Sequence, residues 1–293
     1  AAGGGGPGPG PALPPSLFQL CAELTKVGIC CAAMLCHRAL GRPATIWCGW
    51  RHTLAFALPA TIYLVMNVLT IRAARLLPPP TFQLLANTKI LCTAVASRAV
   101  MGRRLTAAQW AAMLLLTAGV ALGQWRGGEG SGLTPSLGAL LMVINSCLSA
   151  LGGVCTERLL KANAGSQLSI FASNMHMAGH TLLLNSAFMA AECWVCGQGL
   201  PEARWPGFPE VAALGNEAMN GILISLLMKR VDTIAKNYAF SASVFVTAGL
   251  SAAVLQHRPS WNFYAGAGAT VASMWLYSMG GASAVQAQQK KAV

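Results

Sequence analysis

Acidic residues are scarce in this chain: only eight of its 293 positions are Asp or Glu, and charged residues of both signs make up 10%. Soluble domains usually carry about a quarter charged residues. Apolar residues fill 55% of the positions here, and the mean hydropathy is +0.54. The composition argues against a soluble domain and predicts an all-α, polytopic membrane protein whose surroundings include membrane lipid.

Catalytic and metal-binding signatures are also missing. The sequence has no Gly-rich phosphate loop, no G-x-S-x-G elbow and no H-E-x-x-H helix. His176 and His180 are four residues apart, but a zinc site needs at least a third ligand. We therefore expect no catalytic residue, no metal and no cofactor, and we do not expect an enzyme.

Windows of about 20 mostly apolar residues mark candidate membrane spans. Nine are predicted, near residues 15–36, 52–72, 79–101, 106–125, 135–157, 168–192, 208–229, 233–256 and 260–280. The chain is divided accordingly into a low-complexity Gly/Pro-rich N-terminus (1–14), a transmembrane domain (15–282) and a C-terminal tail (283–293). Because the sequence opens with this Gly/Pro-rich run and without Met, we expect that a helix upstream of it is missing; a cleaved signal peptide is the alternative.

Basic residues predict the orientation in the membrane. Thirteen fall in alternate connections and five in the others; the larger set is Arg38, Arg42, Arg51, Arg98, Arg103, Arg104, Arg158, Lys161, Lys229, Arg230, Lys236, Lys290 and Lys291. The positive-inside rule places that set, and the C-terminus, in the cytosol. The net charge of +12 thus comes from loops, and no nucleic-acid partner is expected.

The ten cysteines do not suggest a disulfide framework. Seven lie in apolar spans, where cysteine behaves as a small hydrophobe, and Cys48 falls in a cytosolic loop. Cys193 and Cys196 form a CxxC at the non-cytosolic end of the sixth span, where a lumenal disulfide or simple packing are both open. A single CxxC is weak support for zinc.

Lys89 is the most informative residue. It lies near the middle of residues 80–101, a stretch long enough to span a bilayer, with no acidic residue within two helical turns. A lysine at such a depth costs about 2.5–3.5 kcal/mol even on permissive insertion scales, so it normally faces a wet cavity or a partner. We predict that Lys89 meets an anion in a polar pathway.

Other polar residues flank this site in sequence. Tyr63 and Asn67 share a helical face and could hold a planar base, although Tyr63 could equally pack in a core. Lys236 lies about one turn inside the eighth span, where snorkelling is the alternative. Two local pairs, Glu23 with Lys26 and Glu157 with Lys161, are interpreted as structural, because each can neutralise itself.

An internal repeat relates the two halves. A shift of 154 positions aligns residues 93–100 with 247–254, with five of eight identical, and continues to Arg104 against Arg258. The copies are five spans apart, so the halves should have opposite orientations, as in transporters built from inverted repeats. Chance similarity between Ala-rich helices is the alternative.

Several stretches together resemble one family. They are Ala22-Glu23-Leu24-Thr25-Lys26, residues 59–67, Thr81-Phe82-Gln83 through Asn87-Thr88-Lys89-Ile90, Gln109-Trp110, residues 153–161 and Asp232-Thr233-Ile234-Ala235-Lys236. The chain resembles the nucleotide-sugar transporters of the drug/metabolite transporter superfamily, in the branch of the CMP-sialic acid, UDP-galactose and UDP-N-acetylglucosamine carriers. The resemblance covers about residues 22–282.

The resemblance implies ten helices in two inverted halves of five, the first of which this chain would lack. It implies that Lys89 and Lys236 meet the phosphates and that Tyr63, Asn67 and Phe82 hold the nucleotide. Further cavity positions match Asn174, Asn220, Gly221 and Ser225, for which helix packing is the alternative. The implied activity is exchange of a cytosolic nucleotide sugar for a lumenal nucleoside monophosphate in the Golgi, and a homodimer is left open.

The chain departs from the family pattern in three places. Met66-Asn67-Val68 replaces Gln-Asn-Asn, Asn237-Tyr238-Ala239 replaces Gly, an aromatic residue and Ser, and Ser173 stands where some sialic-acid carriers have Arg. The sugar and the base therefore stay open. A membrane-embedded transferase and a non-transporting scaffold are the alternative functions.

The last four residues add an expectation about location. Lys290 and Lys291 stand fourth and third from the end of the sequence, as in dilysine retrieval signals of endoplasmic reticulum and early Golgi proteins. Cycling between the Golgi and the endoplasmic reticulum is expected if this signal is read. A solvated, orientation-setting tail is the alternative.

Overall fold

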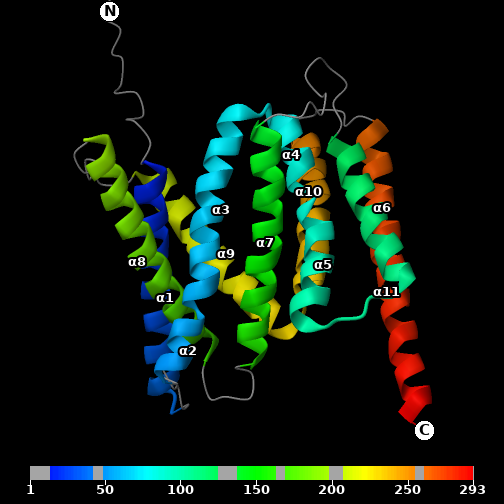
Figure 1. Ribbon diagram of the computed structural model, residues 1–293, viewed down its shortest axis with the longest axis horizontal. Helices are drawn as coiled ribbons and strands as arrows, with labels where there is room; N and C mark the ends of the chain where they lie inside the picture. Colours follow the sequence, from blue (N-terminus) through cyan, green and yellow to red (C-terminus); the bar gives the residue numbers. More distant parts are fainter. Residues whose placement is uncertain are drawn as a thin grey trace, which may run out of the picture. The chain divides into compact units, whose positions relative to one another are not determined.

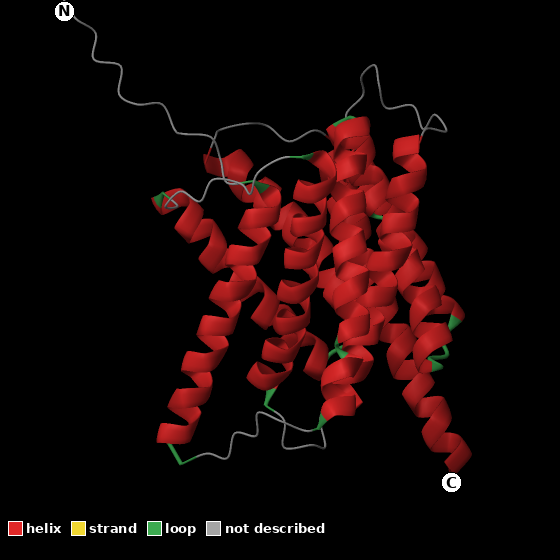
Figure 2. Cartoon of the chain, turned by 60° about the vertical axis from the view of Figure 1, so that its left-hand side comes forward, coloured by secondary structure: helices red, strands yellow, loops and turns green. Residues whose placement is uncertain are grey.

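The computed structural model describes residues 14–41, 49–124, 137–162, 169–197, 207–254 and 261–292. The regular elements in these ranges are all helices (Figure 2). They divide into two compact units: the first is Ala1–Ala60 with Asn163–Leu226, and the second is Thr61–Ala162 with Leu227–Val293. Each unit is built from two separate stretches of the chain.

The helices have the length and the surface of membrane helices. Four described stretches are long and apolar enough to cross a bilayer: Ser16–Ala39, Trp50–Leu76, Leu137–Ala162 and Phe208–Arg230. Large apolar side chains are left exposed along the helices, for example Leu183 at 71% and Trp275 at 66%. Such extensive apolar exposure is not tolerated in a soluble monomer. The protein is a helical membrane bundle, which confirms the predicted fold class.

The first unit contains α1 (Pro15–Ala39), α2 (Trp50–Ala55), α8 (Ile170–Cys196) and most of α9 (Phe208–Arg230). Helices α1 and α8 lie side by side (Figure 1), and Met34 packs on Ala172 between them. The backbone of α8 is capped at its start by Ser169, whose hydroxyl accepts from the Ala172 amide at 3.1 Å. His180 joins α8 to α2 through a 2.8 Å hydrogen bond between Nε2 and the Thr53 carbonyl.

The second unit contains most of α3 (Ala57–Leu76), together with α4 (Pro79–Ala86), α5 (Lys89–Met101), α6 (Ala107–Gln124), α7 (Leu137–Ala162), α10 (Thr233–Val254) and α11 (Trp261–Ala292). In Figure 1, α6 runs next to α11 along the length of α6, and α11 extends beyond it. A Cβ atom on Gly119 would lie 2.8 Å from the Ala269 Cβ and 3.2 Å from the Gly266 oxygen. Small residues thus allow this close pairing, as in many membrane helix pairs.

Two predicted spans are interrupted in the structure. Helix α2 ends at Ala55 and α3 begins at Ala57. Pro59 explains this break, because a proline ring clashes with the carbonyl four residues earlier, here that of Ala55. The span predicted at 79–101 likewise consists of α4 and α5, separated at Asn87 and Thr88.

The second interruption changes the position of Lys89. The residue begins α5, whereas the sequence suggested the middle of one continuous helix. At the break, the Leu85 carbonyl accepts from the Thr88 amide at 3.1 Å and from the Ser146 hydroxyl of α7 at 3.2 Å. The exposed backbone is therefore satisfied within the protein, as lipid surroundings require.

The ends of several helices are fixed by local contacts. Helix α6 starts with a capping box, in which the Thr106 amide donates to Gln109 Oε1 at 3.0 Å and the Gln109 amide donates to the Thr106 hydroxyl at 3.2 Å. Helix α5 ends at Gly102, whose φ of 66° suits glycine. Helix α11 continues to Ala292, through the residues assigned to the C-terminal tail.

Candidate functional site

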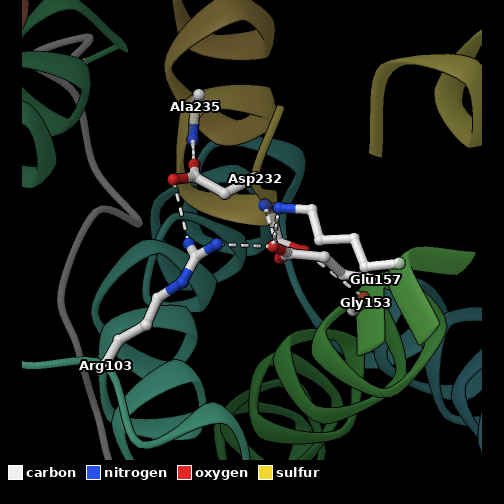
Figure 3. Close-up of polar contacts among 7 residues, drawn as sticks. Arg103, Gly153, Glu157, Asp232 and Ala235 are labelled. Atoms are coloured by element: carbon white, nitrogen blue, oxygen red, sulfur yellow. Dashed lines mark hydrogen bonds and ion pairs between the residues drawn. The ribbon is translucent and has the colours of Figure 1, made fainter. Parts of the chain in front are cut away.

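An ionic cluster around the buried Glu157 joins α7 and the start of α10 to the segment between α5 and α6 (Figure 3). Arg103 lies in the segment between α5 and α6 and points toward two carboxylates. Its Nη2 lies 2.8 Å from Oε1 of Glu157 on α7, and its Nη1 lies 2.9 Å from Oδ2 of Asp232, the residue before α10. The planar guanidinium can serve two carboxylates at once, which a lysine cannot do with the same geometry.

Glu157 is the centre of the cluster. Its side chain is fully buried, and Oε1 also accepts from Lys161 at 2.7 Å. The other oxygen accepts from the Thr233 amide at 2.8 Å and from the Thr233 hydroxyl at 2.7 Å. The predicted Glu157–Lys161 pair is thus present, but it is part of a larger cluster, because Glu157 also binds Thr233 of α10 and Arg103. Asp232 in turn accepts from the Ala235 amide at 2.7 Å and caps α10.

Lys89 and Lys236 are far apart in sequence, but each lies in the first turn of its helix, and these two helices, α5 and α10, are in contact. Gly153 of α7 makes room beside Lys236, because a Cβ atom there would lie 3.7 Å from its Nζ and 3.0 Å from the Thr233 methyl. Among the described residues, neither lysine forms an ion pair with a carboxylate. Two such ammonium groups are suited to bind an anion.

An aromatic ring that the sequence analysis missed accompanies these lysines. The Lys89 Nζ lies 4.3 Å from the centroid of the Phe240 ring on α10. Phe240 follows Lys236 by four residues, so a search for neighbours on the same helical face could have found it. A second link joins the same helices, because Asn237 donates to the Thr93 hydroxyl at 2.9 Å. Asn237 is one of the departures from the family pattern.

Three predicted nucleotide-holding residues of the second unit lie in different surroundings. The Tyr63 hydroxyl is 3.3 Å from that of Thr156, and its ring lies against Gly152, on the α7 turn that also contains Gly153. Asn67 is half-buried one turn further along α3. Phe82 packs with the apolar cluster around Leu85.

The remaining predicted residues belong to the first unit. Asn174 and Ser225 are both buried, and the Ser225 hydroxyl donates to Asn174 Oδ1 at 2.8 Å, linking α8 to α9. Gly221 lies against Lys26, because a Cβ atom there would be 2.7 Å from the lysine Cε. Lys26 is buried and binds Glu23 at 2.8 Å, which confirms that predicted pair. Asn220 is exposed on α9.

The described residues offer little for metal chemistry. No group of three or more His, Cys, Asp or Glu that could hold an ion occurs in the part of the chain that the structure describes. His176 stacks on Phe56 with ring centroids 6.2 Å apart, and His180 binds the backbone of α2. The Cys193/Cys196 prediction includes a side chain, that of Cys196, outside the described residues. The site is therefore one of positive charge and polar groups inside a membrane bundle.

Comparison with known proteins identifies the family of the chain. A family model described as nucleotide-sugar transporter matches residues 15–278. The chain belongs to the nucleotide-sugar transporter family. This confirms the resemblance found in the sequence, and the relatives are named as transporters rather than enzymes.

Individual relatives show the extent of the similarity. The UDP-galactose translocator of Mus musculus is 34% identical over 234 residues, which cover 78% of this chain and 59% of the relative. The CMP-sialic acid transporter 2 of Oryza sativa subsp. indica is 27% identical over 226 residues, covering 77% and 63%. A crystal structure of a protein with 17% identity superposes with a TM-score of 0.66 over 92% of this chain and 89% of its own, which shows a shared fold. The chain thus spans about three fifths of the length of the two relatives.

Proposed function

We propose that this nucleotide-sugar transporter exchanges a cytosolic nucleotide sugar for a lumenal nucleoside monophosphate. The observation that carries the proposal is the pair Lys89 and Lys236, which the fold brings near each other while no described carboxylate pairs with either. A charged side chain inside a membrane bundle is costly, so it normally has a partner or faces a wet cavity, and the diphosphate or monophosphate of a nucleotide supplies the negative charge that these two lysines lack.

The substrate belongs to the CMP-sialic acid or UDP-galactose/UDP-N-acetylglucosamine class. The names of the two relatives and the motifs around Lys89 and Lys236 support this class. Tyr63, Asn67 and Phe82 hold the nucleotide, as the family resemblance implies. The family resemblance adds four further candidate substrate contacts, namely Asn174, Asn220, Gly221 and Ser225. Met66 and Val68 stand where the family commonly has polar residues, and their apolar side chains narrow the hydrogen-bonding choices for the base.

Exchange proceeds by alternating access between two inverted halves. The repeat that relates residues 93–100 to 247–254 supports this mechanism. The basic connections, including Arg103 and Lys229, face the cytosol, so the nucleotide sugar enters from that side. The protein works in the Golgi membrane, where glycosylation consumes nucleotide sugars and leaves nucleotides to be returned, and it can cycle to the endoplasmic reticulum.

Reconstitution tests this proposal directly. Purified protein is placed in liposomes loaded with CMP or UMP, and uptake of labelled CMP-sialic acid, UDP-galactose and UDP-N-acetylglucosamine is measured. Uptake that depends on the internal nucleotide supports an exchanger. Conversion of the substrate without uptake would instead indicate a membrane-embedded transferase, and the absence of both would indicate a non-transporting scaffold.

A further inference from the structure

The contact between Lys89 and Phe240 is not explained by packing alone. The ammonium group lies over the ring face, 4.3 Å from its centroid, rather than at a carboxylate. The ring is 56% exposed, so it belongs to no apolar cluster of the described core. The π face of an aromatic ring attracts a cation at this distance.

The backbone around the contact is fixed on both sides. Asn237, three residues before Phe240, donates to the Thr93 hydroxyl at 2.9 Å. That hydroxyl donates in turn to the Lys89 carbonyl at 2.6 Å. These two hydrogen bonds connect the first turn of α5, which begins at Lys89, to the early turns of α10, which contain Asn237 and Phe240. This arrangement places the ring against Lys89 reproducibly, although a lysine side chain has four flexible bonds.

The ring is a partner that leaves the charge of Lys89 in place. No described carboxylate pairs with Lys89, and Glu157 is occupied by Arg103, Lys161 and Thr233. An aromatic face stabilises a cation without neutralising it. It also occupies only one side of the ammonium group, which has three donors. An anion can therefore bind Lys89 while the ring remains in place.

We propose that Phe240 is a positioning residue for the anion site: it holds the Lys89 ammonium group so that its free donors meet the phosphate. This inference rests on the proposed function, in which Lys89 binds the phosphate. The ring itself need not touch the nucleotide.

The test measures binding of CMP and UMP to the purified, full chain. Phe240→Leu keeps an apolar side chain but removes the π face, and we expect the dissociation constant to rise about two- to fivefold, as follows from cation–π strengths at partly exposed sites. Phe240→Tyr and Phe240→Trp keep an aromatic face at this position and should bind CMP and UMP like the wild-type protein. Phe245→Leu is the matched control, because Phe245 is on the same helix but contacts Phe263 instead of a cation.

A graded series excludes a purely steric role. Phenylalanine carrying one, two or three fluorine atoms is introduced at position 240, which weakens the attraction for a cation stepwise while changing the shape little. We expect the dissociation constant to rise stepwise with fluorine number. Equal affinity across the series in the otherwise wild-type chain would overturn the proposal.

A second measurement separates this inference from the proposed function. Lysines are reductively methylated with ¹³C-formaldehyde, and the Lys89 methyl signal is assigned with Lys89→Arg. Ring currents should move this signal upfield, and Phe240→Leu should remove the shift, whether or not the protein transports anything. A signal that is unaffected by Phe240→Leu refutes the contact. A shifted signal in a protein that binds no nucleotide refutes the positioning role together with the proposed function.

Discussion

Arg103 gives the sharpest test of how the second unit is held together. Replacing it with alanine leaves Glu157 fully buried with one cationic partner fewer. A hydrogen bond to a charged group contributes about 1.5–3 kcal/mol. The Asp232 pair is about one quarter exposed on each side, so it adds only about 0.2–1 kcal/mol. We therefore expect Arg103→Ala to lower the free energy of unfolding by about 2–4 kcal/mol.

The assay is unfolding of the purified protein in detergent, followed by tryptophan fluorescence. Arg104→Ala is the matched control, because Arg104 is the adjacent arginine, is exposed and lies outside the described cluster. Arg103→Lys should give an intermediate loss, since one ammonium group cannot match the two-carboxylate geometry. If Arg103→Ala unfolds at the same denaturant concentration as Arg104→Ala, the cluster does not stabilise the unit and this reasoning is wrong.

Two further variants test other contacts. Gly221→Ala should slow nucleotide exchange several-fold, because the added methyl group displaces the buried Lys26. Gly215→Ala, on the same helix, is the control and should exchange like wild type, because no atom lies within 4 Å of the added Cβ. Equal exchange rates for the two variants would contradict the contact between Gly221 and Lys26. Copper phenanthroline should oxidise Cys92 and Cys147, whose sulfur atoms are 3.4 Å apart, to a disulfide linking α5 to α7, visible by peptide mapping without reductant. Cys92→Ser is the control and should give no linked peptide. If the oxidised wild-type protein also gives no linked peptide, α5 and α7 are not adjacent at these cysteines.

Hydropathy predicted the positions of the helices well, because each span needs about 20 apolar residues whatever its partners. It did not predict the interruptions. The effect of Pro59 depends on where α3 begins, since proline is tolerated in a first turn. The break before Lys89 is accompanied by a hydrogen bond from Ser146, a residue of another helix.

The sequence predicted those contacts of the site that join residues close to each other in the chain, but not those that join distant segments. Glu23 with Lys26 is a local pair and was found from its spacing. The contacts of Arg103 with Glu157 and Asp232 join distant segments, so no periodicity indicates them. Lys89 was conspicuous because a charge in an apolar span is costly. Its contact with Phe240 joins α5 to α10, so sequence spacing could indicate only that Phe240 shares a helical face with Lys236.

The most direct test of the central claim compares Lys89→Ala with wild type in liposomes loaded with CMP or UMP. The measured quantity is the initial rate of nucleotide-sugar uptake, with Lys229→Ala as a control lysine at the end of α9. If Lys89 meets the phosphate, Lys89→Ala should insert and fold normally but lose exchange, while Lys229→Ala keeps it. Exchange by Lys89→Ala at the wild-type rate would contradict the assignment of Lys89 as the anion-binding residue.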